Sequence, residues 1–317
     1  MTNLNNDISY TTDEIAQLLK VSKLTVYDII KKGEIRAYRV GRQMRVDAVD
    51  LAAYKERLKS GGESNSTPAH TVIQHVQAPE PVTNNQVIIS GQDLSLDIIA
   101  SSLEETGLYR PLRSFSGSLN SLVKMYQGQA DIVSTHLFDG ETGEYNLPYI
   151  NRLLTGRSYM VIHLLGRTAG LYVQKDNPKQ LQNWSDLDRA DVRLVNREKG
   201  SGARVLLDEQ LRLAGITGRS IAGYDDEELN HMAIATRIAS GQADVGVGIE
   251  KTARLIGVDF IPLIQEQYDL VLIKTTENEK LRELIIETLS SVAFKEKLTA
   301  IGGYDVTKTG TVLYETR

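Results

Sequence analysis

The sequence predicts two domains of different fold class: a small, mainly α-helical domain with a β-hairpin at the amino terminus, and a larger two-lobed α/β domain. The chain has 317 residues. A domain usually has about 100–200 residues, so a single hydrophobic core is not expected to serve the whole chain. Residues 60–86 are rich in Gly, Ser, Asn, Thr and Pro, which is a linker composition. Beyond them, strand-like apolar runs alternate with helix-like periodic stretches, which is typical of βαβ units with a largely parallel sheet. We therefore expect a first domain over 1–60, a linker over 61–85 and a second domain over 86–317.

The composition excludes several classes of protein. With 41% hydrophobic and 24% charged residues, the chain is neither collagen-like nor wholly disordered. The absence of cysteine excludes disulfides, thiolate zinc sites and cysteine nucleophiles, and the five scattered histidines predict no metal site. No apolar run approaches the roughly 18 residues of a membrane helix, and the start MTNLNNDISY does not resemble a signal peptide. We expect a soluble cytoplasmic protein with no membrane partner.

The net charge of -5 is unevenly divided along the chain. Residues 1–60 hold 11 Lys or Arg against 8 Asp or Glu, whereas the remainder holds 25 against 33. Within 23–45 there are seven basic and two acidic residues. Such a basic stretch indicates either a surface that faces a polyanion or a plain solvated face, so the motifs must decide.

Two short helices are predicted near the amino terminus. Thr11 and Glu14 form a capping box, and the apolar residues that follow it predict a helix over 12–20. Ser22 then caps a second helix that ends at Gly33. Its buried face consists of Val26, Ile29 and Ile30. Two short helices joined by a turn of this length form a helix-turn-helix.

A β-hairpin follows the second helix, with strands over 35–40 and 43–46 and Arg42 near its tip, and Asp47 caps a closing helix. The stretch YTTDEIAQLLKVSKLTVYDIIKKGEIRAYRVGRQMRVDAVDLAAY resembles the excisionase/MerR-type winged helix-turn-helix family, in which the hairpin is the wing. The resemblance implies double-stranded operator DNA as a partner, with the second helix in the major groove. A specific operator normally has two half-sites, so we expect a homodimer or higher homo-oligomer. The predicted DNA-binding residues are Ser22, Lys23, Thr25, Tyr27 and Lys31 on the second helix, and Arg42 and Arg45 on the wing.

The larger domain contains an internal echo. Gly-Gln-Ala-Asp followed by a β-branched residue occurs at 128–132 and again at 241–245. In both places a helical pattern ends at a Gly suited to the left-handed position past the last turn, and a strand follows. The echo predicts two similar lobes, unless so short a match is a coincidence.

Three strand-to-helix loops in this domain are rich in Ser and Gly, at 88–93, 115–120 and 199–204. Free N–H groups at a helix start and Ser hydroxyls can hold an anion or a small polar ligand, although one such loop alone is usually only a helix cap. In open α/β sheets, ligands bind beyond the carboxyl ends of the strands, where these loops lie. The pattern therefore favours a ligand cleft between two lobes.

From Ile88 to the end, the sequence resembles the type II periplasmic-binding-protein fold, in the cytoplasmic form fused to regulator helix-turn-helix domains. The matching stretches include SGSLNSL, GQADIVSTHLFD, RTAGLYVQKDNP, GSGAR and GQADVGVGI. Related proteins are molybdate-binding receptors and LysR-type effector domains. The resemblance implies lobe I over 86–165 and 270–317, lobe II over 170–265, and two crossovers near 163–170 and 263–270. The ligand-binding residues it implies are Ser90, Ser116, Gly117, Ser118, His136, Ser201, Gly202, Arg204 and Tyr268.

We interpret the chain as a DNA-binding transcription regulator that senses a small anion. Helix N-termini and hydroxyls favour molybdate or tungstate, whereas Arg204 beside the site would equally suit a carboxylate or a phosphate-bearing metabolite. An enzyme acting on a small phosphorylated substrate is the second alternative. No nucleophile–base pair or metal cluster supports it, and Gly200-Ser-Gly lacks the Lys-Ser/Thr of a P-loop. We therefore expect no catalytic residue, no metal and no cofactor.

Overall fold

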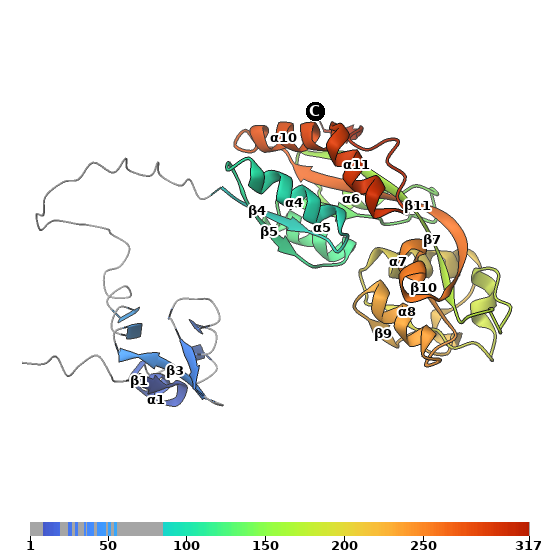
Figure 1. The fold of residues 1–317 in the computed structure, drawn as a ribbon, viewed down its shortest axis with the longest axis horizontal. Helices are drawn as coiled ribbons and strands as arrows, with labels where there is room; N and C mark the ends of the chain where they lie inside the picture. Colours follow the sequence, from blue (N-terminus) through green and yellow to red (C-terminus); the bar gives the residue numbers. More distant parts are fainter. Residues whose placement is uncertain are drawn as a thin grey trace, which may run out of the picture. The chain divides into compact units, whose positions relative to one another are not determined.

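The computed structural model describes residues 9–19, 25–26, 29–30, 35, 37–40, 43–48, 50–51, 54–55 and 85–316 (Figure 1). The chain divides into two compact units, over 1–78 and 79–317. Each unit is described by itself below.

The smaller unit pairs a short helix with a three-stranded antiparallel sheet of order β1-β3-β2. The sequence analysis did not foresee β1. Its cross-strand partners run from Ser9 opposite Asp47 to Thr11 opposite Arg45, so it extends the predicted hairpin by one strand. These elements are β1 (Ser9–Thr11), α1 (Thr12–Leu19), β2 (Tyr38–Val40) and β3 (Gln43–Asp47).

The predicted capping box and buried helix face are both confirmed. The Thr11 backbone N–H donates to Glu14 Oε2 at 2.8 Å, and the Glu14 N–H donates back to Thr11 Oγ1 at 3.4 Å. Val26 is fully buried, and Ile29 and Ile30 pack against the same hydrophobic cluster. These three residues are the predicted buried face of the second helix. The other buried members of this core are Ile15, Ala16, Ile35, Val46, Leu51 and Tyr54.

Lobe I of the larger unit is a sheet covered by helices on both faces. On one face, α4, α10 and α11 pack against a cluster that includes Ile89, Ile162 and Leu272. On the other face, α5 and α6 pack against Val133, Val161 and Val271. Side chains alternate between the two faces along a strand, so these residues point away from the first cluster. The elements are β4 (Gln86–Ser90), α4 (Ser95–Glu105), β5 (Arg110–Ser114), α5 (Ser118–Tyr126), β6 (Ile132–Thr135), α6 (Leu147–Leu153), α10 (Glu279–Ser290), α11 (Val292–Ile301) and β12 (Val312–Glu315).

Lobe II repeats this layering on a smaller scale. One face of its strands packs against α7 and η1 through Leu171 and Val247, and the other packs against α8 and α9 through Tyr172 and Val195. The elements are η1 (Trp184–Asp188), β8 (Asn196–Arg197), α7 (Gly202–Leu213), η2 (Gly218–Ser220), β9 (Glu227–Glu228), α8 (His231–Ala239), β10 (Val245–Ile249) and α9 (Glu250–Ile256).

Two long strands, β7 (Tyr159–Val173) and β11 (Asp259–Ile273), run through both lobes. They pair antiparallel along their lengths, with β-bulges at 262–264 and 268–269. The main sheet order is β10-β7-β11-β6-β4-β5, and β12 also pairs with β7. The predicted crossovers at 163–170 and 263–270 are therefore the middle parts of these two strands.

The expectation of a largely parallel sheet was wrong. Only β5, β4 and β6 pair in parallel within the main sheet, and the pairings of β6, β7, β10, β11 and β12 with one another are antiparallel. The reason is that β7 and β11 cross between the lobes in opposite directions, which the alternation of strand and helix patterns does not reveal. The α/β layering itself, with helices on both faces, is confirmed.

The internal echo is structurally real. In both copies a helix, α5 or α8, is followed by a Gly with φ near +72°, and a strand, β6 or β10, then begins. The Asp of each copy accepts a backbone N–H from a neighbouring strand segment: Asp131 from Ile88 at 2.7 Å and Asp244 from Arg193 at 2.8 Å. In each lobe, the Asp side chain of the motif thus makes the same contact with the backbone of a neighbouring strand segment.

Gly170 supplies a test of the crossover. A Cβ at this position in β7 would lie 2.0 Å from the Ile261 carbonyl oxygen, which belongs to the β11 backbone. We expect Gly170→Ala to lower the free energy of unfolding by about 1–3 kcal/mol, because the strand backbone must move to make room. Urea unfolding followed by fluorescence of Trp184, the only tryptophan of the chain, measures this.

Gly166→Ala in the same strand is the matched control. Its added Cβ would find its nearest neighbour, Asp305 Cβ, at 3.4 Å, an ordinary contact. We expect a change within about 0.5 kcal/mol. Equal losses in the two variants would contradict the close approach at Gly170.

Candidate functional site

A cavity of about 440 Å³ lies between the two lobes of the larger unit. Its lining residues come from lobe I, from lobe II and from the two long strands. They are Gly91, Gln92, Asp93, Leu94, Ser116, Gly117, Ser118, Ser134, His136, Arg167, Arg197, Ser201, Gly202, Asn230, His231, Met232, Ile249, Lys251, Thr252, Leu255, Tyr268 and Tyr304.

Among the helices of eight or more residues that the structure describes in this unit, four begin at the cavity, two from each lobe. Their N-cap residues all line it: Leu94 for α4, Gly117 for α5, Ser201 for α7 and Asn230 for α8. Each helix start carries a partial positive charge and N–H groups without an intrahelical partner. Four such starts around one cavity create an environment that favours an anion.

The starts of α5 and α7 touch directly across the cavity. The Leu119 N–H donates to the Gly200 carbonyl at 3.0 Å, and a Cβ on Gly117 would come within 2.8 Å of the same oxygen. A Cβ on Gly202 would lie 2.1 Å from the His136 ring. Glycine at 117 and 202 therefore allows the two lobes to close upon each other at this point.

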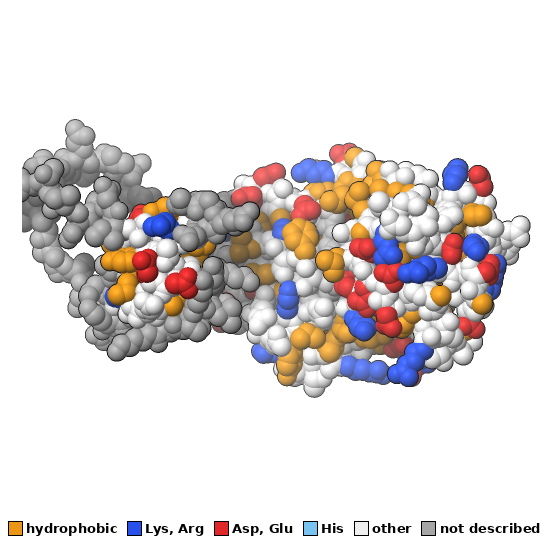
Figure 2. Space-filling view, turned by 90° about the horizontal axis from the view of Figure 1, so that it is seen from below, with side chains coloured by type: hydrophobic (Ala, Val, Ile, Leu, Met, Phe, Trp, Pro, Cys, Tyr) orange, Lys and Arg blue, Asp and Glu red, His pale blue; other side chains and the backbone are white. Residues whose placement is uncertain are grey.

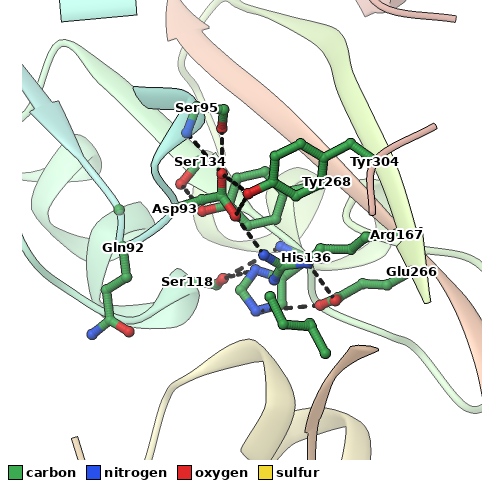
Figure 3. A network of polar contacts seen from close by, with 12 residues as sticks. Gln92, Asp93, Ser95, Ser118, Ser134, His136, Arg167, Glu266, Tyr268 and Tyr304 are labelled. Carbon is green, nitrogen blue, oxygen red and sulfur yellow. Dashed lines mark hydrogen bonds and ion pairs between the residues drawn. The ribbon is translucent and has the colours of Figure 1, made fainter. Parts of the chain in front are cut away.

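A buried ion network forms one wall of the cavity, and Figure 3 shows it from close by. Arg167, in the middle of β7, donates to Asp93 at 2.7 Å and to Glu266 at 2.8 Å. The Asp93 carboxylate also accepts hydrogen bonds from Ser95 and from the Tyr304 hydroxyl. Arg167 lies over the Tyr268 ring at 4.5 Å.

The network fixes the charges of its members. Burial acts to raise the pKa of Asp93, but Arg167 and the Ser95 hydrogen bonds outweigh it, and the pKa is lowered. Burial likewise opposes the charge of Arg167, but Glu266 and Asp93 raise its pKa. For Glu266, burial is the larger effect and the pKa is raised.

His136 connects the network to the start of α5. Its Nδ1 lies 3.0 Å from Ser118 Oγ, its Nε2 lies 3.3 Å from Glu266 Oε1, and its ring stacks on Tyr268 at 4.9 Å. Burial, together with Arg167 and Arg197, holds the pKa of His136 well below its ordinary value. The same effects, with burial first, act on His231. Both imidazoles are therefore neutral at pH 7.

Arg197 is the second buried guanidinium of the cavity. Its Nε and Nη2 donate to Glu198 at 2.7 and 2.9 Å, and Nη2 also donates to Gln92 at 2.6 Å. Gln92 belongs to lobe I and Arg197 to lobe II, so this contact spans the cleft. Its side-chain hydrogen bonds to the described residues all come from Nε and Nη2, so Nη1 has no partner among those residues, and Arg197 lines the cavity.

The structure brings together seven of the nine predicted ligand-binding residues. Ser116, Gly117, Ser118, His136, Ser201, Gly202 and Tyr268 all line the cavity. Ser90 does not, because its buried hydroxyl pairs with Ser121 Oγ at 2.9 Å. Arg204 does not either: it bonds Asp208 and Glu227 and lies over the Tyr224 ring. We therefore leave Ser90 and Arg204 out of the proposed site.

The residues that the sequence analysis missed include Asp93, Ser134, Arg167, Arg197 and Lys251. Arg167 had a signal: it is the one charged residue in the otherwise mainly apolar run of β7. Arg197 had a weaker signal, because the segment before it, 192–196, also contains Arg193 and Asn196. A charge inside a buried strand usually has a partner or a function. Asp93, Ser134 and Lys251 carried no comparable signal.

Of the predicted DNA-binding residues, the structure describes two side chains. Thr25 is exposed, and Arg45 is half-buried and donates to Ser9 Oγ at 3.0 Å. Ser22, Lys23, Tyr27, Lys31 and Arg42 lie outside the described residues. Within the described part of the chain, no helix is long and apolar enough to cross a membrane, and no group of three or more acidic or histidine side chains is placed to hold a metal.

The fold and the cavity define a helix-turn-helix domain fused to a two-lobed ligand-binding domain. The chain belongs to the PBP superfamily, because residues 100–290 match the PBP superfamily domain. Residues 9–59 match a helix-turn-helix domain. The uncharacterized protein YvgK of Bacillus subtilis is 52% identical over 313 residues, covering 99% of this chain and 100% of YvgK. The two-domain combination implied by the sequence resemblances is thereby confirmed.

Solved structures show the same fold in transport proteins. The tungstate ABC transporter protein of Geobacter sulfurreducens has a TM-score of 0.51 at 11% identity, covering 68% of this chain and 98% of that one. A protein of Clostridium perfringens with bound phosphate, described as a phosphate ABC-transporter substrate-binding protein, has a TM-score of 0.51 at 13% identity, covering 70% and 99%. At these identities the likeness concerns the fold alone. The family matches support a DNA-binding regulator with a ligand-binding domain.

The two neutral histidines predict a pH dependence of stability. In the unfolded chain a histidine titrates near pH 6.5, whereas in the folded protein the pKa values of His136 and His231 are lower. Below about pH 6.5 the unfolded state therefore binds more protons, and stability is lost as the pH falls, by up to about 1.4 kcal/mol per pH unit for each histidine. Urea unfolding of the larger unit at pH 7.5 and 5.5 measures the loss.

The double variant His136→Gln, His231→Gln separates this effect from the titration of carboxylates. We expect its free energy of unfolding to depend less steeply on pH over the same interval than that of the parent. An unchanged slope would show that the two imidazoles are not held neutral.

Proposed function

We propose that this protein is a one-component transcription regulator of the cytoplasm whose larger unit senses a small anion. The observation that carries the proposal is the convergence of four helix N-caps from two lobes on one cavity, in a chain that also holds a helix-turn-helix domain. We propose that it binds duplex operator DNA as a homodimer or higher homo-oligomer, because paired half-sites need paired reading heads.

Closure of the lobes is the step that an effector would control. In the structure, contacts already join the lobes: Gln92 with Arg197 and Glu198, Leu119 with Gly200, and Gly140 with Glu209. An anion bound among the helix starts adds attraction that exists only when both lobes face it. The closed form is thereby favoured, and a coupling of about 1–3 kcal/mol to DNA affinity is typical of such systems.

Molybdate and tungstate are the first effectors to test, since helix starts, serine hydroxyls and neutral imidazoles suit a tetrahedral oxyanion. A small carboxylate or a phosphate-bearing metabolite is the alternative. Its original support, Arg204, faces away from the cavity, but Arg167 and Arg197 line it instead. One feature favours the enzyme alternative: Ser118 Oγ lies 3.0 Å from Nδ1 of the neutral His136, which pairs a nucleophile with a base in the cavity. We propose a regulator instead, because the same chain holds a helix-turn-helix domain.

Thermal unfolding against a panel of oxyanions and carboxylates tests the sensor. An effector at about 100 times its Kd stabilises the folded state by about 2.7 kcal/mol, which raises the Tm of a domain of this size by roughly 5–10 °C. Ser118→Ala should reduce the shift, because this hydroxyl lines the cavity. Ser101→Ala, an exposed position on α4, is the control and should leave it unchanged. A panel without any shift would remove the support for anion sensing.

Removal of two predicted DNA contacts tests the helix-turn-helix domain as the DNA-binding part of the chain. We expect Lys23→Ala with Arg42→Ala to weaken binding to a random-sequence DNA duplex and to reduce the slope of log K against log salt by about 2, as two phosphate contacts are lost. The control, Lys280→Ala with Lys297→Ala, removes the same charge from exposed positions of the larger unit. If both double variants lose affinity equally, net charge rather than the wing and second helix governs binding.

A further inference from the structure

The cavity has a polar floor and an apolar mouth. On the floor, Ser118, Arg167, Arg197, Ser201 and Tyr268 are all buried. At the mouth, three apolar side chains line the cavity while remaining more than half exposed: Leu94 at 55%, Met232 at 53% and Leu255 at 67%. They come from the start of α4, the start of α8 and the second turn of α9, so they surround the opening from both lobes. We call these three residues the apolar collar.

Among the described residues, the other exposed large apolar side chains do not line this cavity. Figure 2 shows basic and acidic side chains intermingled on one face of this unit. A collar of exposed apolar groups around a polar pocket marks a place where a ligand covers them. A bare oxyanion on the floor would leave all three in water.

The volume of the cavity also indicates a ligand larger than a bare oxyanion. A tetrahedral oxyanion has five heavy atoms and displaces at most about five waters, or roughly 150 Å³ at about 30 Å³ per water. The cavity of about 440 Å³ is several times larger. Pockets of roughly 300–1,000 Å³ are those in which proteins hold organic ligands.

The free donors on the floor decide the kind of anionic group. Arg197, whose side chain is 2% exposed, uses Nε and Nη2 on protein acceptors, and Arg167, at 4%, uses Nε and Nη1. Within the described residues, each has one terminal nitrogen left for a ligand. These two free terminal nitrogens, each with two N–H groups, and several helix N–H groups reach a ligand group from different directions. That pattern suits the three oxygens of a phosphate better than a carboxylate, which pairs with a whole guanidinium fork.

A further cation stands beside the collar. Lys251 lines the cavity and lies over the Tyr304 ring at 5.0 Å, and it has no ion-pair partner in the described part of the chain. Lys251 and Leu255 are four residues apart on α9, so they share one face of that helix. A ligand that contacts the collar therefore also lies near the ammonium group of Lys251.

We infer that the effector is an organic phosphate monoester: its phosphate lies on the floor among the helix starts, and its apolar or aromatic body contacts the collar. The inference rests on the proposed function, since it narrows the class of anion sensed by the same cavity. It favours the phosphate-bearing alternative over molybdate and tungstate. The collar then senses the size of the ligand, because only an organic body can bridge Leu94 of lobe I and Met232 of lobe II.

Calorimetric titration of the full chain with inorganic phosphate, tungstate, naphthyl phosphate and naphthol tests the inference. We expect naphthyl phosphate to bind at least about tenfold more tightly than inorganic phosphate or tungstate, with a negative heat-capacity change from apolar burial. Naphthol, which lacks the anion, should bind far more weakly. Tungstate or inorganic phosphate binding as tightly as naphthyl phosphate would overturn the inference while leaving the anion sensor intact.

A variant of the collar shows which part of the ligand is recognised. Leu94→Ser with Met232→Ser should weaken naphthyl phosphate about tenfold and leave inorganic phosphate unchanged. Leu213→Ser, at a position 53% exposed at the end of α7 and outside the cavity, is the control for the polar substitution. If the collar variant binds naphthyl phosphate like the parent, the inference is wrong. If no anion in the panel binds the parent chain, the inference and the proposed function both fail.

Discussion

The paired strands β7 and β11 are the constraint on which the larger unit depends. They pair antiparallel along their lengths and run through both lobes. At their middle, Arg167 of β7 is the cross-strand partner of Glu266 of β11. The same arginine reaches Asp93 at the start of α4, so one guanidinium joins two strands and a helix of lobe I. A buried charge without its partners costs several kcal/mol. The network therefore holds this wall of the cavity in one arrangement.

The electrostatics of the cavity follow from this arrangement. Asp93 and Glu266 neutralise Arg167, and Glu198 neutralises Arg197, so the floor has no large excess of charge. The attraction for an anion comes instead from four helix starts, whose dipoles are fixed in place and need no counterion. The neutral imidazoles of His136 and His231 add hydrogen-bonding groups without adding charge. Such a site would discriminate among anions by geometry rather than by total charge, as the proposed sensor requires.

Part of the site was predictable because local sequence rules govern it. Ser116, Gly117 and Ser118, and Ser201 with Gly202, follow strands and open helices, and each such loop must lie at the ligand edge of an α/β sheet. The prediction for Arg204 was wrong because its position in the first turn of α7 does not determine which way a long side chain points. It turns toward Asp208, Glu227 and Tyr224, groups brought there by the fold of lobe II. Arg167 and Asp93 are 74 residues apart, and no local rule connects them.

The amino-acid sequence by itself determined the two-domain organisation, the capping box, the hairpin and the echo at 128–132 and 241–245. These depend on periodicity, turn residues and side-chain bonds between near neighbours, all of which are local. Only the tertiary structure decided that the main sheet is mixed, that the crossovers are continuous strands, and that Arg167 of the first crossover and Arg197 of lobe II meet at one cavity. These features depend on contacts between residues far apart in the chain, whose pairing follows from packing rather than from any single stretch of sequence.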